Sequence, residues 1–242
     1  MVLNQDKPSK RLEFYSGVKS VSPILIGVIP FGLVFGILGL ESGLTSLQTF
    51  LMSSIIFAGA SQVAFVQLVS NGTLPIITII SVGIINLRHF LYSAALSKYL
   101  GHLPIKWKIP LAYLITDEAF AVTIKRMING KESIFSHYYL LGSGITLWLT
   151  WQTSTLSGIL LGKTIPEEFN LGFTIPLVFL SLIAPNVIKY KSHALCALAA
   201  GSFAVIFHSL PSNIWIILAS LIGLLTAAFV NKIELNIQKK IS

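Results

Sequence analysis

Two acidic side chains, Asp117 and Glu118, interrupt a strongly apolar stretch that runs from Ile109 to Ile124. An ionised carboxylate near the centre of a membrane helix costs about 2.5 to 3.5 kcal/mol on insertion scales. Acids retained at such a depth therefore indicate a compensating role, such as binding a cation or exchanging protons. We expect the functional site to include this pair.

A cationic motif lies in the apolar run that precedes the acids. Arg88 and His89 fall near the middle of the stretch from Leu74 to Ala95. A guanidinium at this depth needs an anionic partner, so we expect Arg88 to pair with Asp117 or Glu118. Two interpretations stay open: a permanent ion pair that locks two helices together, or an exchangeable pair in which Arg88 meets a substrate carboxylate.

Helix geometry limits how these four groups can be used. Adjacent helical residues point about 100° apart, so Asp117 and Glu118 cannot both face one partner, and neither can Arg88 and His89. We expect one member of each pair to face a cavity, and the other to face a second helix or the interface.

The composition indicates that a lipid bilayer surrounds these groups, because 54% of the residues are hydrophobic and only 11% are charged. We predict an all-α, polytopic integral membrane protein of about eight transmembrane helices. The predicted spans cover residues 20–40, 46–70, 74–97, 109–124, 135–161, 172–188, 193–209 and 213–230. The fourth is short, so a re-entrant or tilted element, and seven crossings, is the alternative.

Basic residues in short loops predict the orientation, because cationic loops are retained in the cytoplasm. We expect a cytoplasmic amino-terminal segment (1–19), a single transmembrane domain (20–230) and a cytoplasmic tail (231–242) in the plasma membrane. The lysines near residues 98–108 then fall outside, against the rule; they are Lys98, Lys106 and Lys108.

Small residues are concentrated in the first two predicted spans. The first holds Pro30 within the glycine-rich run from Gly27 to Gly39, and the second holds the run from Phe57 to Gln62, which includes Gly59. Such runs allow close helix packing. They also break membrane helices and expose backbone groups that can bind substrate, so we expect the first helix to be broken by its proline and glycines.

These motifs carry a family resemblance. The chain resembles the AzlC-type branched-chain amino acid exporters in its first-span Pro/Gly pattern, in Phe57-Ala-Gly-Ala-Ser-Gln, in Asn86-Leu-Arg-His-Phe-Leu-Tyr and in Thr116-Asp-Glu-Ala-Phe-Ala, over roughly residues 16 to 190. Asn170-Leu171-Gly172 stands where the family pattern leads us to expect an aspartate. The resemblance implies efflux of leucine, isoleucine, valine and analogues, together with a small membrane subunit of the AzlD type.

Residue chemistry and the resemblance combine into a hypothesis of mechanism. An amino acid needs an anionic site for its ammonium, a cationic or amide-rich site for its carboxylate and an apolar pocket. We assign the ammonium to Asp117 or Glu118, and the carboxylate to Arg88 and the amides near Pro30. The aliphatic side chain is assigned to Phe57, Phe90 and Phe120, and the further substrate-binding candidates are Asn86, Gln62 and Gly59.

Proton coupling is part of the same hypothesis. Asp117 or Glu118 would exchange protons, because burial disfavours a charged carboxylate while a nearby Arg88 favours it. His89 could relay those protons; a buried His89 bonded to a carbonyl is the alternative.

Other function classes are disfavoured by what the sequence lacks. We expect no cofactor, no metal site and no nucleic-acid partner, since Cys196 is the single cysteine and the bases are scattered among loops. No motif of a known membrane-embedded enzyme is present. An uptake permease or channel and a non-catalytic structural membrane subunit are the alternatives to an exporter.

Overall fold

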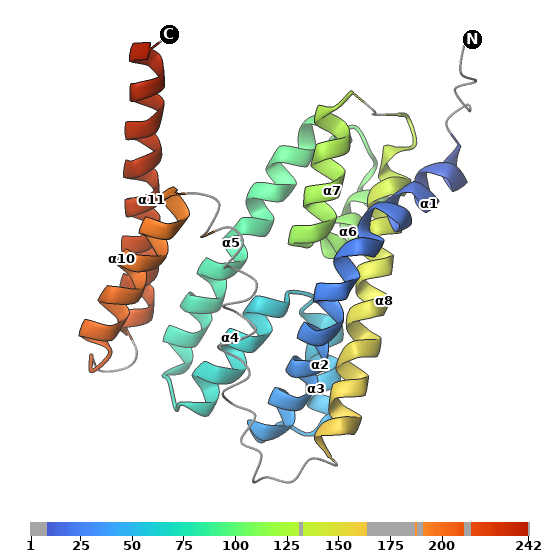
Figure 1. Cartoon of the computed structure of the whole chain (residues 1–242). Helices are drawn as coiled ribbons and strands as arrows, with labels where there is room; N and C mark the ends of the chain where they lie inside the picture. The colour runs from blue at the N-terminus through green and yellow to red at the C-terminus, as the bar shows by residue number, and fades with distance from the viewer. Residues whose placement is uncertain (1–8, 131–132, 164–186, 188–190, 211–213, 242) are drawn as a thin grey trace. The chain divides into compact units, whose positions relative to one another are not determined.

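The structure is a computed structural model that describes residues 9–130, 133–163, 187, 191–210 and 214–241. Every regular element in these ranges is helical (Figure 1), which confirms the all-α prediction. Among the described residues, three helical stretches are long and apolar enough to cross a membrane: Lys10–Glu41, Pro75–Leu100 and Ile214–Ile233. The chain is therefore an all-α membrane protein.

The chain divides into two compact units. Unit 1 comprises residues 1–67 and 83–169, and unit 2 comprises residues 68–82 and 170–242. All of the predicted site residues belong to unit 1.

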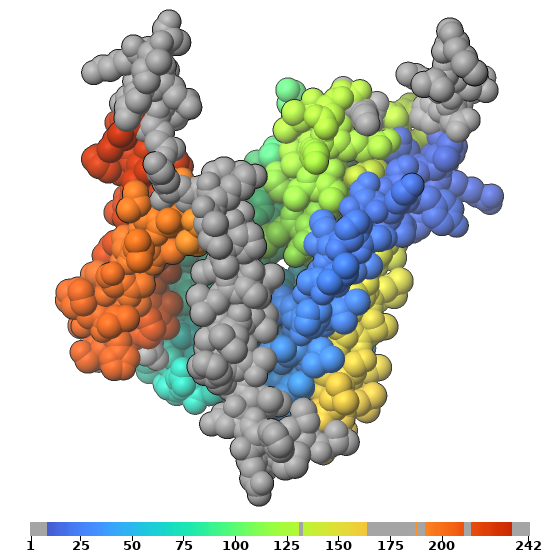
Figure 2. All heavy atoms as spheres, viewed as in Figure 1, coloured from blue at the N-terminus to red at the C-terminus, as the bar shows by residue number. Residues whose placement is uncertain are grey.

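The scaffold of unit 1 is a close parallel pairing of two long elements. The first consists of α1 (Lys10–Val21), a 3-10 turn η1 (Ser22–Ile24) and α2 (Leu25–Glu41), and the second is α8 (Ser136–Gly162). Figure 2 shows the blue helices packed along yellow α8. The irregular turn contains Pro23. α2 continues through Pro30 and the neighbouring glycines, where the sequence led us to expect a break.

Glycines explain how closely these backbones approach. A Cβ added at Gly17 would collide with the carbonyl oxygen of Tyr139, and one added at Gly36 would collide with that of Thr155. Only glycine leaves room for such contacts. Because Gly17 meets the start of α8 and Gly36 meets its later turns, α1–α2 and α8 run in the same direction.

The predicted second span is in fact two helices. It consists of α3 (Ser46–Ile55) and α4 (Gly59–Ser70), and the residues between them are not helical. The Gln62 amide nitrogen reaches the Met52 carbonyl oxygen at 3.0 Å. These residues would lie about 15 Å apart along a continuous helix. The chain therefore turns back after α3, and we call α3 and α4 the first hairpin.

The predicted fourth span is likewise two helices, α6 (Ile105–Leu114) and α7 (Asp117–Ile128), which we call the second hairpin. At the start of α6, the Trp107 ring packs against Tyr138, 5.1 Å away and near the start of α8. The end of α6 lies deeper, because Leu114 meets Gly144. Near the end of α7, the Arg126 guanidinium lies 4.7 Å over the Tyr139 ring. The second hairpin thus enters and leaves at the same end of α8.

This arrangement corrects the predicted placement of the loop lysines. The end of α5 (Pro75–Leu100), which passes along the second hairpin, also lies at the end of unit 1 where α8 begins. There Tyr99 and His102 share a cavity of about 300 Å³ with Met127 and Ser136. Residues 98–108 therefore lie at the same end of unit 1 as the first turn of α1. The prediction that residues 109–124 form one helix crossing the membrane is wrong.

Unit 2 contains α10 (Lys191–Phe207) and α11 (Ile214–Ile241). They pack through Gly223, where an added Cβ would touch Cys196 and Ala200. Both coincide with predicted spans, although α11 extends beyond residue 230. Apart from residue 187, the predicted span 172–188 lies outside the described residues.

Candidate functional site

The break in the second hairpin places Asp117 at the start of a helix. Thr116 is extended, and its hydroxyl oxygen accepts a hydrogen bond of 3.3 Å from the backbone N–H of Ala119, so it caps α7. Carboxylates are favoured in the first turn of a helix, where backbone N–H groups point outward. The Thr-Asp-Glu sequence thus starts a half-helix and stabilises an acid at its tip.

Asp117 is the acid that meets Arg88. Nη1 of Arg88 lies 2.5 Å from Oδ2 of Asp117. The Tyr92 hydroxyl, one turn further along α5, donates to Oδ1 at 2.7 Å. Both carboxylate oxygens are therefore held by α5. The side chains of Arg88 and Asp117 keep 28% and 43% of their surface exposed, so the pair is accessible rather than sealed in the core.

The neighbouring charged groups point in other directions, as helix geometry requires. Glu118 lies beside the side chain of Thr116. Nδ1 of His89 lies 3.3 Å from the Asn86 carbonyl oxygen. Of the two acids, Asp117 faces Arg88, and Glu118 makes a separate contact. Of the two basic residues, Arg88 faces Asp117, and His89 makes a separate contact.

Arg88 keeps an unused donor next to this pair. Its Nε is buried and has no hydrogen-bond partner within the part of the chain that the structure describes. A guanidinium can bind a carboxylate through two parallel N–H groups. Because Nε is buried, a second anion can reach this donor only when the neighbouring side chains move.

The tip of the first hairpin exposes carbonyl groups that side chains cap. Gln152 donates to the Ser53 carbonyl at 3.1 Å. Gln62 donates at 3.0 Å to the Met52 carbonyl, which also accepts the backbone N–H of Ile56 at 2.9 Å. The Tyr113 hydroxyl, from the second hairpin, donates to the Ser54 carbonyl. Unsatisfied carbonyls are costly in a membrane, so these donors make the break in the helix stable.

Several predicted site residues gather around the two tips. The Ser61 hydroxyl donates to Oδ1 of Asn86 at 2.6 Å, which ties α4 to α5. The buried Phe57 ring lies 6.1 Å from the Tyr113 ring. Phe120 stacks on Tyr92 with ring centroids 4.3 Å apart. The tips and the middle of α5 thus combine charged, amide and aromatic groups in one region.

Three other predicted residues have different surroundings. A Cβ added at Gly59 would meet the Trp151 and Phe31 rings, so this glycine serves close packing. Phe90 is 75% exposed on α5. Pro30 is exposed within α2, and no described contact joins Phe90 or Pro30 to the Arg88 pair.

The predicted site residues leave out several polar residues that the structure places at the site. Tyr92 holds Asp117, Tyr113 joins the tips, and Trp148 donates from its indole N–H to the Tyr113 hydroxyl at 2.8 Å. Gln152 contacts both Ser54 and Ser53. The available signal was a cluster of aromatic and polar residues at 148–155 within an apolar helix.

The sequence also matches a known protein family. The model of the AzlC protein family matches residues 23–165, which is more than half of the chain. The chain belongs to the AzlC family. This stretch includes both hairpins and the Arg88–Asp117 pair, and AzlC proteins act in membrane transport. No solved structure matches the chain.

Relatives of the chain match most of its length. It is 32% identical over 220 residues to an uncharacterized membrane protein of Archaeoglobus fulgidus, covering 89% of this chain and 94% of the relative. It is 29% identical over 222 residues to the inner membrane protein YgaZ of Escherichia coli, covering 88% and 89%. It is 23% identical over 193 residues to the branched-chain amino acid transport protein AzlC of Bacillus subtilis, covering 76% and 74%.

Proposed function

We propose that the chain exports branched-chain amino acids as the large subunit of a two-component exporter. The observation that carries this proposal is the accessible ion pair of Arg88 and Asp117, 2.5 Å apart at the tip of a half-helix. An amino acid carries the same two charges, so its carboxylate and ammonium can replace Asp117 and Arg88 as partners. The substrate class follows the name of the Bacillus subtilis relative.

Each part of the substrate has an assigned partner. The Arg88 guanidinium takes the carboxylate, and Asp117 takes the ammonium. Tyr92 then keeps Asp117 in position. The aliphatic side chain lies against the aromatic rings near the tips, Phe57 and Phe120, which suits an apolar group of limited size.

Proton coupling is assigned to the same helix start. Glu118 is adjacent to Asp117 but is not held by Arg88, so it can change protonation without breaking the pair. Asp117 itself exchanges a proton when neither Arg88 nor the substrate ammonium holds it. His89, one residue from Arg88, is positioned to relay protons.

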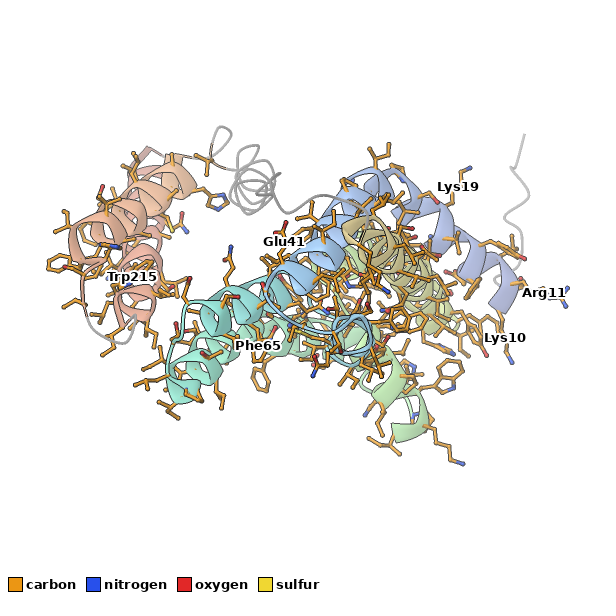
Figure 3. The ribbon with its side chains drawn as sticks, turned by 90° about the horizontal axis from the view of Figure 1, so that it is seen from below. Lys10, Arg11, Lys19, Glu41, Phe65 and Trp215 are labelled. Carbon is orange, nitrogen blue, oxygen red and sulfur yellow. The ribbon has the colours of Figure 1, made fainter. Side chains whose placement is uncertain are left out.

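The proposed setting is the plasma membrane, with the amino end in the cytoplasm. The end of unit 1 where α1 and α8 begin carries most of the loop cations, which the positive-inside rule places inside. They include Lys10, Arg11, Lys98, Lys106, Lys108 and Lys125. Arg11 and Lys19 project outward from α1 (Figure 3). A small membrane subunit of the AzlD type completes the proposed exporter.

The test is efflux of leucine, isoleucine and valine from preloaded cells that express the chain with its small partner. Wild type is compared with Arg88→Gln, Asp117→Asn and Glu118→Gln at equal membrane abundance. Loss of efflux in these variants supports the proposal. Unchanged efflux in all three variants would show that these residues have only a structural role. Accumulation of the amino acids by the wild type, instead of efflux, would favour an uptake permease.

A further inference from the structure

We propose that the hydrogen bond from Tyr113 to the Ser54 carbonyl is a gate between the two hairpin tips, and that Tyr113 releases Ser54 when substrate passes. This inference rests on the proposed transport function, and it names a residue that controls the path rather than one that binds the charges. It follows from how the first hairpin is capped.

The Ser54 carbonyl depends on Tyr113 because its normal helical partner is used elsewhere. In a continuous helix this carbonyl would accept from the backbone N–H of Ala58. In the structure that N–H donates to the Ile56 carbonyl at 2.8 Å. Tyr113 therefore replaces a backbone bond across the break, and its release leaves a carbonyl that water or a substrate ammonium can occupy.

Tyr113 differs from the other two caps in its freedom to move. Gln62 is fully buried and Gln152 is 5% exposed, so both are fixed within the core. Tyr113 is 40% exposed. It is also the cap that comes from the second hairpin, so its bond alone among the three joins the two tips. A movement that separates the tips must break this bond, and it leaves the other two intact.

Trp148 holds the Tyr113 hydroxyl in the position that closes the gate. Its indole N–H donates to the Tyr113 hydroxyl at 2.8 Å from the wall formed by α8. The hydroxyl thus accepts from Trp148 while it donates to Ser54, which aligns the phenol between the scaffold and the first hairpin. The site residues lie just beyond, since Tyr113 is four residues before Asp117.

The experiment measures how accessible the tip is to a thiol reagent. In a chain carrying Cys196→Ser, the buried Ala58 is changed to cysteine and the chain is expressed with its partner subunit. Maleimide labelling is compared with and without Tyr113→Phe. This substitution keeps the ring beside Phe57, so the fold is retained, and Tyr15→Phe on the exposed face of α1 is the matched control.

Tyr113→Phe is expected to speed labelling about five-fold, because losing one net hydrogen bond raises the population of the open state by about that factor. Trp148→Phe should give a smaller increase, because the Tyr113 hydroxyl remains. Unchanged labelling in Tyr113→Phe at normal membrane abundance would overturn the gate. Faster labelling in Tyr113→Phe, with no leucine efflux from wild type and no effect of leucine on labelling, would retain the gate and reject the proposed function.

Discussion

Arg88 and Asp117 are 29 residues apart in the sequence, yet their side chains lie 2.5 Å apart. They meet because the helix that would carry Asp117 across the membrane is interrupted at Ile115 and Thr116. The interruption makes Asp117 the first residue of a new helix, which faces the middle of α5. The ion pair is thus a product of the second hairpin, and its accessibility follows from the hairpin tip.

Tyr92→Phe should weaken transport without removing it. The hydroxyl donates to Asp117 at 2.7 Å, and a hydrogen bond to a charged group contributes about 1.5 to 3 kcal/mol. The ring stack on Phe120 stays. We expect the apparent KM for leucine efflux to rise about ten-fold or more, measured against Tyr99→Phe near the end of the same helix. An unchanged KM would mean that Asp117 does not need this donor.

The second hairpin makes a prediction about sidedness. In the Cys196→Ser background, Lys106→Cys and Arg11→Cys should react with a membrane-impermeant thiol reagent from one side, and Glu41→Cys from the other. Lys106 and Arg11 lie at the end where α8 begins, whereas Glu41 ends α2 at the opposite end of the scaffold. Reaction of Lys106→Cys and Arg11→Cys from opposite sides would contradict the second hairpin and support one membrane-crossing helix over residues 109–124.

The ion pair of buried Glu13 with part-exposed Arg126 should stabilise unit 1. Nη2 of Arg126 lies 2.8 and 2.9 Å from the two Glu13 carboxylate oxygens, and Ser133 donates to Oε1 at 2.9 Å. Removing one charge from a fully buried pair costs about 3 to 5 kcal/mol, and the 22% exposure of Arg126 lowers this cost. Glu13→Gln should therefore lower the unfolding temperature in detergent far more than the exposed Lys19→Gln.

A double variant tests whether Glu13 and Arg126 stabilise the fold through their interaction with each other or independently. If the cost of Glu13→Gln comes from the charge left on Arg126, then Glu13→Gln with Arg126→Gln should lose less stability than the two single changes added together. Additive losses would show that the two side chains act independently.

Gly36→Ala should disrupt the scaffold, because the new Cβ would meet the Thr155 carbonyl oxygen in the backbone of α8. We expect a loss of about 1 to 3 kcal/mol in the free energy of unfolding. Gly27→Ala is the matched control in the same helix, since nothing lies within 4 Å of its added Cβ. Equal thermal stability of the two variants would contradict the close pairing of α2 and α8.

Hydropathy predicted the fold class, but it did not predict the hairpins. α3, α4 and α6 are about as apolar as the continuous helix α5, whereas α7 is more polar. A window over 46–70 or 109–124 therefore resembles one helix. The start of α7 was visible in the sequence, because a threonine followed by two acids is a typical helix start. A second sign of the hairpin was that a single crossing over 109–124 put the lysines at 98–108 outside, against the positive-inside rule.

Contacts between distant residues could not be predicted in the same way. The pairing of Arg88 with an acid followed from the cost of burying a lone charge, but the choice of Asp117 over Glu118 depends on the direction in which α7 starts. The bond from Tyr113 to Ser54 joins two breaks that the sequence analysis did not place. Phe90 was assigned to the pocket from its motif, whereas α5 turns it outward with 75% of its surface exposed.

The most direct test of the charge assignment is competition against leucine transport by two analogues that each lack one charge. Leucinamide lacks the carboxylate, and 4-methylvalerate lacks the ammonium. We predict that wild type prefers leucine to both, that Arg88→Gln loses about ten-fold or more of its discrimination against leucinamide, and that Asp117→Asn loses a similar factor against 4-methylvalerate. Wild-type discrimination in both variants, at normal membrane abundance and with residual transport, would contradict the assignment of Arg88 and Asp117 to the two charges of the substrate.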